Sequence, residues 1–143
     1  MNKKMRLLKG VMALIVGVSI ISTPIITVYA ASNKVAISMN RRYVSGAANG
    51  KYHSLNKGTV KLNVSAKGFG NSNPTSTVAL YKEKFGKDDF FGRVNISSGK
   101  NYYYKNKTKE FSTKANAKSS KYYLVSEKAM DWYTVKIEGT ISN

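Results

Sequence analysis

The chain has 143 residues, with 24 Lys and Arg against 7 Asp and Glu, one His and no Cys. The lack of cysteine excludes a disulfide framework, a cysteine-based zinc site, a thiol nucleophile and a lipidated cysteine anchor. One histidine and seven acids leave few ways to build a catalytic acid–base pair, so the composition favours a non-enzymatic binding protein.

The first thirty residues have the pattern of a secretory signal peptide. A basic start precedes an uncharged apolar run over 11–21, and a polar stretch ending in small residues follows. We expect a signal-peptide helix followed by cleavage between Ala30 and Ala31, which leaves a mature chain of residues 31–143. The alternative is an uncleaved anchor, because the uncharged stretch is long enough to span a bilayer. Polar residues interrupt its second half, which favours cleavage and release from the cell.

The mature chain is strongly basic. Four basic residues and no acid leave with the signal, so 20 basic and 7 acidic residues remain, a net charge of +13. Solubility alone asks for a net charge of about 2–8 in a small domain. Most of the bases are lysines, which suit general attraction to a polyanion better than the bidentate readout that arginine provides. We therefore expect an anionic envelope polymer or lipid headgroups as partner, and rank nucleic acid lower because the chain is exported and carries no nucleic-acid-binding motif.

Alternation of apolar and polar residues at period two predicts β-strands after the signal. The alternation is clearest over 59–67, where four apolar residues from Val60 to Ala66 are predicted to face a core. The other runs with this pattern are 35–39, 78–80, 90–96 and 133–141. Only 115–120 and 127–131 could form a helical turn.

These runs, separated by turn-forming glycines, asparagines and prolines, predict an all-β fold. We expect one small antiparallel β-sandwich of jelly-roll or immunoglobulin-like type, with six to eight strands over residues 31–143. A chain of this length can bury about two-thirds of its unfolded surface, which is enough for one core.

The same alternation predicts which large side chains face outward. Phe91 is expected outside if Phe90 faces the core, and Tyr123 and Trp132 are expected outside because their neighbours face inward. At least one ring among 102–104 must also point outward, and Tyr103 is the candidate. Aromatic rings among lysines can stack on sugars or anchor at a lipid interface. The predicted binding residues are Lys82, Lys84, Lys87, Phe91, Arg93, Tyr103, Lys105, Lys107, Lys109, Tyr123, Trp132 and Lys136.

The chain carries no recognisable catalytic motif. His53 is alone in sequence and is expected in a surface loop, without an orienting acid nearby. Asp88 and Asp89 share a turn and, with Glu83, offer fewer oxygens than a calcium site needs. We therefore expect no catalytic residue, metal or cofactor.

The leading hypothesis is a secreted, basic β-sandwich that adheres to an anionic cell envelope. A bacteriocin-like antimicrobial effector would use the same surface against a competitor, and composition does not separate the two. A carbohydrate-binding module is a third hypothesis, with Trp132 as its stacking platform for a neutral glycan. A small hydrolase is the fourth, and the scarcity of acid–base residues disfavours it.

Overall fold

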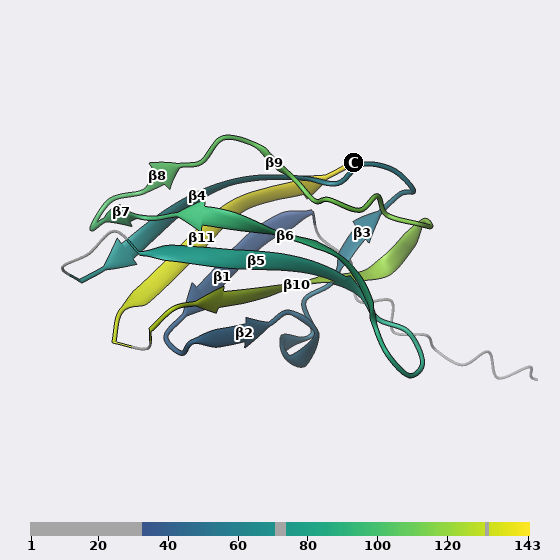
Figure 1. Cartoon of the computed structure of the whole chain (residues 1–143), viewed down its shortest axis with the longest axis horizontal. Coiled ribbons are helices and arrows are strands. Elements are labelled where there is room, and N and C mark those ends of the chain that lie inside the picture. The colour runs from purple at the N-terminus through teal and green to yellow at the C-terminus, as the bar shows by residue number, and fades with distance from the viewer. Residues whose placement is uncertain (1–32, 71–73, 131) are drawn as a thin grey trace, which may run out of the picture.

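A computed structural model describes residues 33–70, 74–130 and 132–143, which form two β-sheets packed face to face (Figure 1). The six long strands are β1 (Lys34–Met39), β4 (Lys61–Phe69), β5 (Thr75–Lys82), β6 (Asp89–Ser97), β10 (Ser119–Lys128) and β11 (Thr134–Ser142). The short elements are β2 (Tyr43–Ser45), the 3₁₀ turn η1 (Ala47–Asn49), β3 (His53–Leu55), β7 (Gly99–Lys100), β8 (Tyr104–Lys105) and β9 (Lys109–Glu110). The predicted all-β sandwich is thus confirmed.

The expected signal peptide over residues 1–30, with its cleavage between Ala30 and Ala31, lies outside the described residues. Within the described part of the chain, no helix is long and apolar enough to cross a membrane.

The first sheet has the strand order β1-β11-β4-β7, with β8 and β9 also pairing with β4. The second sheet has the order β2-β10-β5-β6, with β3 also pairing with β10. The pairings are antiparallel except that of β4 with β7, which is parallel. The strands of the described residues pair with one another in these two sheets.

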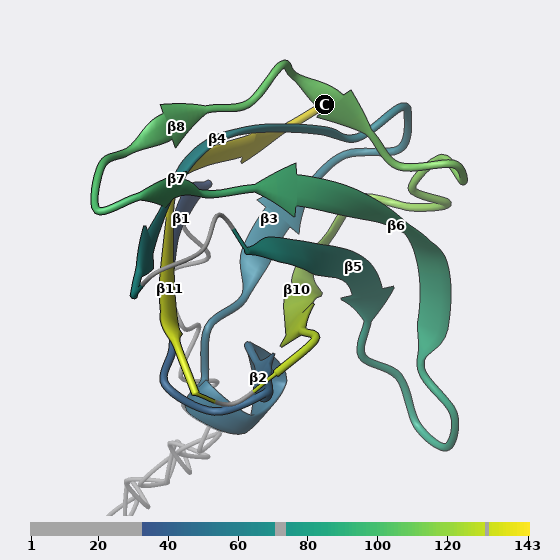
Figure 2. The same cartoon turned by 60° about the vertical axis from the view of Figure 1, so that its left-hand side comes forward.

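The segment from β6 to β9 crosses between the two sheets. β6 belongs to the second sheet, and after Ser98 the chain continues as β7 beside β4 of the first sheet (Figure 2). The side-chain amide of Asn106 donates to the Ser97 carbonyl oxygen and accepts from the Ser97 N–H, both at 2.9 Å. The backbone N–H of Asn106 donates to the Val64 carbonyl oxygen at 3.1 Å. Asn106 therefore ties β4 of the first sheet to the end of β6 in the second.

The core lies between the sheets and follows the predicted alternation in most strands. Val60, Leu62, Val64 and Ala66 are all buried, and their polar neighbours in β4 face outward. Each sheet has one face on the core and one on solvent, so a period of two in the sequence becomes a period of two in burial.

β6 breaks this alternation at a bulge, and the predicted exposure of Phe91 is wrong. The pairing moves from Ala79↔Arg93 to Tyr81↔Phe90, so β6 contains one residue more than β5 between these two pairs. The extra residue reverses the faces that precede it. Phe91 is 2% exposed and packs edge-on against Tyr122, while Phe90 lies on the outer face.

The predicted exposure of Tyr123 is also wrong, for a different reason. Tyr123 points to the outer face of the second sheet, as alternation requires, but other side chains cover it. Its ring stacks on Tyr81 at 5.6 Å and meets Tyr52 edge-on at 6.2 Å, and its hydroxyl donates to Asp88 Oδ2 at 2.5 Å. Only 7% of Tyr123 remains exposed.

The two predicted helical turns are wrong where the structure describes them. Residues 119–120 and 127–128 are part of β10, and the short helical turn that does form is η1. Pairing of Ser119 with β3, and of residues 127–128 with β2 and β5, outweighs the weak local preference of these residues.

Candidate functional site

The predicted binding residues divide between the two sheets and do not form one site. Those carried by the first sheet and its edge segment are Tyr103, Lys105, Lys107, Lys109, Trp132 and Lys136. Those carried by the second sheet and its β5–β6 hairpin are Lys82, Lys84, Lys87, Phe91, Arg93 and Tyr123.

On the first sheet, two lysines lie over one aromatic ring. Lys67 of β4 lies directly opposite Lys136 of β11 in the antiparallel register. Phe69 follows Lys67 by two residues and therefore points to the same outer face. The Nζ atoms of Lys67 and Lys136 lie 4.8 Å and 5.5 Å from the centre of the Phe69 ring.

Tyr103 completes this cluster from the edge segment. Its ring centre lies 5.9 Å from Lys67 Nζ, and its side chain hydrogen-bonds with Glu138. Loss of solvation, followed by the Glu138 hydrogen bond and charge, raises the pKa of Tyr103 above its ordinary value of 10.0. The phenol therefore stays protonated at neutral pH. We call Lys67, Phe69, Tyr103 and Lys136 the lysine–aromatic face.

The lysine–aromatic face has two lysines and, beside them, one acid, Glu138, which hydrogen-bonds with Tyr103. Neither Lys67 nor Lys136 forms an ion pair with any described residue. Like charges directly opposite on a sheet are unfavourable, and the shared ring offsets this only in part. Lys105, opposite Ser65 on the far side of β4, adds a third cation to the same outer surface. The arrangement can receive an anion and, beside it, an apolar or ring surface.

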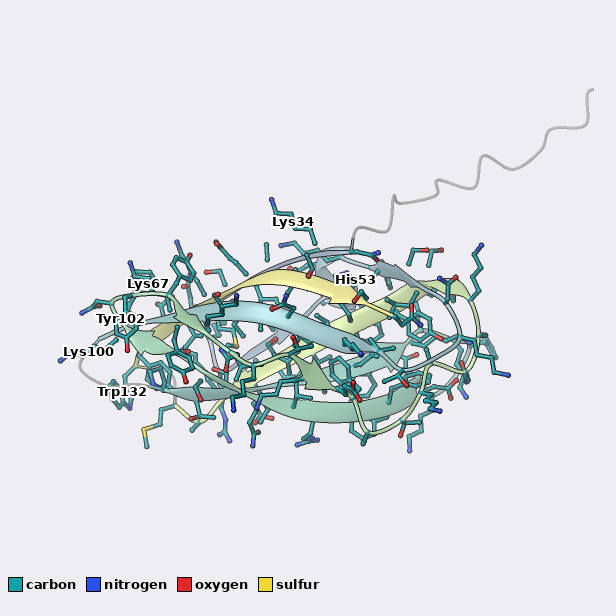
Figure 3. The ribbon with its side chains drawn as sticks, turned by 90° about the horizontal axis from the view of Figure 1, so that it is seen from above. Lys34, His53, Lys67, Lys100, Tyr102 and Trp132 are labelled. Atoms are coloured by element: carbon teal, nitrogen blue, oxygen red, sulfur yellow. The ribbon has the colours of Figure 1, made fainter. Side chains whose placement is uncertain are left out.

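Two further exposed aromatic residues, Tyr102 and Trp132, lie at the same end of the sandwich. Figure 3 places Lys67, Lys100, Tyr102 and Trp132 at this end, away from Lys34 and His53. The predicted exposure of Trp132 is confirmed, at 66%, and its indole N–H donates to Met130 Sδ at 2.9 Å.

A buried lysine supports the loop that carries Trp132. Lys128 is 1% exposed, and its ammonium donates to the carbonyl oxygens of Tyr133 and of Asn40, the latter at 3.5 Å. It also lies 4.9 Å from the centre of the Tyr133 ring. Lys128 therefore links the β10–β11 turn to the turn after β1, so its role is structural.

The β5–β6 hairpin, which holds the predicted lysine run, is neutral as a unit. Three lysines in this segment are balanced by three acids, Glu83, Asp88 and Asp89. Lys84 Nζ pairs with Asp89 Oδ1 at 2.5 Å, and Lys82 Nζ donates to Asn116 Oδ1 at 3.2 Å. The hydrogen bond from Lys84 lowers the pKa of Asp89 below its ordinary value of 3.8. Only Lys87 of the three is left without such a partner among the described residues.

The hairpin acids have internal hydrogen-bond partners. Glu83 Oε1 accepts from the Tyr52 hydroxyl at 3.0 Å, and Asp88 Oδ1 accepts from the backbone N–H of Lys84 at 3.2 Å. The Tyr52 contact holds the hairpin against the body of the protein, and the Lys84 contact closes its turn. In the described residues, no three His, Cys, Asp or Glu side chains come together as metal ligands.

His53 is not in a surface loop as predicted. It lies in β3, opposite Tyr122 of β10, and is 6% exposed because this pairing draws it into the second sheet. It lines a cleft of about 570 Å³ between β1 and the β2–β3 edge, and none of the described residues lining this cleft is acidic.

Sequence reasoning missed Lys67, Phe69 and Phe85. Lys67 and Phe69 share a face by alternation, but their meeting with Lys136 depends on a register that one strand alone does not reveal. Phe85 stands in the turn between Lys84 and Lys87, and it is fully exposed. A large apolar residue in a turn is the signal that could have found it.

Comparison of the chain with protein-family models, with curated protein sequences and with solved structures gives no match.

Proposed function

We propose that the mature domain is a non-enzymatic adhesin for an anionic polymer of the cell envelope, which it binds through the lysine–aromatic face. The observation that carries this proposal is the Lys67–Lys136 pair, two ammonium groups at one aromatic ring, neither of which forms an ion pair with a described residue. Glu138, the acid on the same face, is hydrogen-bonded to Tyr103. A polymer carrying phosphate or carboxylate groups would relieve their repulsion and meet the ring with its apolar backbone.

The net charge of +13 expected for the mature chain supports a polyanion over a small anion. Charge spread over the whole surface attracts a polymer over a distance of about a Debye length, roughly 8–10 Å at ordinary salt. The face then supplies the short-range contact. Binding of this kind falls steeply as salt is raised.

The test is co-sedimentation of residues 31–143 with bacterial sacculi, with and without their teichoic acid, over a salt series. Exchange of Lys67 and Lys136 for Glu should weaken binding roughly tenfold or more, since each charge near an anionic surface contributes about 1 kcal/mol. The matched control exchanges Lys118 and Lys121 for Glu; both are exposed and lie away from the face, and the change in net charge is the same.

Equal losses in both double variants would show that net charge alone governs binding, and the face would then have no role. Salt-resistant binding to sacculi stripped of teichoic acid, lost in Trp132→Ala, would favour the glycan-binding alternative. The exposed Trp132 ring is the observation behind that alternative.

A further inference from the structure

The tip of the β5–β6 hairpin has the features of an interfacial anchor. Phe85 is fully exposed at the turn between two strands, so its ring lies in water with no cover from the body. The hairpin projects from the sandwich, as Figures 1 and 2 both show. Exposing the apolar surface of a phenylalanine ring to water costs free energy, and burying the ring against another apolar surface would recover it.

Two acidic side chains near the tip are hydrogen-bonded to residues of the body, whereas a lysine at the tip has no such partner among the described residues. Glu83 and Asp88 are held back by Tyr52 and Tyr123, through hydrogen bonds of 3.0 Å and 2.5 Å. Lys87, two residues after Phe85 in the same turn, is exposed and has no ion pair with a described residue. The tip therefore presents an aromatic ring and a cation, while its acids are drawn towards the body.

These contacts also keep the hairpin in one shape. Lys84 bridges to Asp89 across the turn, and its backbone N–H donates to Asp88. Because the hairpin turn is already ordered, it loses little conformational entropy on binding, and more of the free energy from burying the ring contributes to affinity.

We propose that this tip is a membrane anchor that inserts the Phe85 ring into the headgroup region of an anionic bilayer. An aromatic ring beside lysine is the combination that favours a lipid interface, where the ring meets acyl chains and the ammonium meets lipid phosphates. The tip is convex and stands alone, which suits a soft interface better than a protein partner, because a protein would need a matching pocket. This site lies on the second sheet and is independent of the lysine–aromatic face.

The direct test places a fluorophore at the tip. Trp132 is the one tryptophan of the chain, so Trp132→Phe combined with Phe85→Trp leaves a single indole at the hairpin turn. With residues 31–143 bound to vesicles of phosphatidylglycerol and phosphatidylcholine, we expect a blue shift and quenching by lipids brominated near the headgroup. Emission that stays that of a water-exposed indole while the protein is bound would overturn the proposal.

The matched control is Phe90, an exposed phenylalanine of the same hairpin that sits beside Tyr81 and back from the tip. Phe85→Ala should lower vesicle affinity roughly tenfold or more, while Phe90→Ala should change it little. Equal losses would indicate unspecific apolar attraction and would also overturn the proposal. Binding to sacculi should be unchanged in Phe85→Ala, so failure of this anchor can be told apart from failure of polymer adhesion.

Discussion

Lys67 and Lys136 lie directly opposite each other on neighbouring antiparallel strands, and the ammonium groups of both lie over the ring of Phe69. A sheet built only for stability would place opposite charges, or no charges, at such a pair. Repulsion between the two ammonium groups therefore destabilises the free protein, and an anion that binds between them would remove this repulsion.

This relationship predicts opposite effects on stability and on binding. Lys136→Thr removes the repulsion and places a good strand residue opposite Lys67, so the free energy of unfolding should rise by about 0.2–1 kcal/mol at low salt. Binding to teichoic-acid-bearing sacculi should weaken in the same variant. Urea denaturation at low and high salt gives the first quantity and co-sedimentation the second.

A loss of both stability and binding in Lys136→Thr would indicate a structural role for the lysine. Lys121→Thr is the control, because Lys121 is an exposed lysine of a paired strand in the other sheet. It should leave binding near the wild-type level.

The bulge in β6 gives a second prediction, about the core. Phe91→Ala should lower the free energy of unfolding by about 3–5 kcal/mol, because it leaves a cavity against Tyr122. Phe90→Ala should cost about 1 kcal/mol or less, since Phe90 is 48% exposed on the outer face and fills no space in the core. Chemical denaturation of the two variants compares them directly, and the reverse order of losses would mean that the strand has no bulge.

The same bulge shows where sequence reasoning succeeds and where it stops. Val60 to Ala66 could be placed correctly because an unbroken strand converts alternation into faces. Phe91 could not be placed correctly, because one extra residue in β6 switches the preceding side chains to the opposite side of the sheet. Gly92 at φ 116° is the local mark of that bulge, and an added Cβ there would meet the Ser112 N–H at 2.9 Å.

The site shows a comparable division. Exposure of Trp132 and of Tyr103 follows from local pattern, and the structure agrees. The cover over Tyr123 comes from Tyr52 and Asp88, which are distant in sequence. Likewise, the neutrality of the β5–β6 hairpin is visible in its composition, but the way its acids turn inward depends on Tyr52 and Tyr123.

Lys128 gives a third prediction. Lys128→Met keeps an apolar stem of similar length but leaves the carbonyl groups of Asn40 and Tyr133 without this donor. The free energy of unfolding should fall by about 1–3 kcal/mol, which denaturation monitored by circular dichroism would measure. The emission of Trp132 should change as well, because the same turn carries that ring. A gain in stability would mean that the cost of burying the ammonium exceeds the value of its hydrogen bonds.

Tyr123 gives a prediction for alkaline pH. Burial, followed by the hydrogen bond to Asp88, raises the pKa of Tyr123 above its ordinary value of 10.0. In the unfolded chain the phenol ionises near pH 10, whereas in the folded protein it keeps its proton. Its contribution to stability is therefore fully present below pH 10 and is lost as the pH rises from there through the folded-state pKa.

Urea denaturation at about pH 9 and about pH 11 should accordingly show a steeper loss of stability in the wild-type protein than in Tyr123→Phe. Lysines and the other tyrosines titrate in both proteins, so their effect largely cancels in the difference between the two slopes. Absorbance at the phenolate band should show one fewer late-ionising tyrosine in the folded variant. Equal slopes would mean that Tyr123 ionises alike in the folded and unfolded chains, and that Asp88 does not hold its proton.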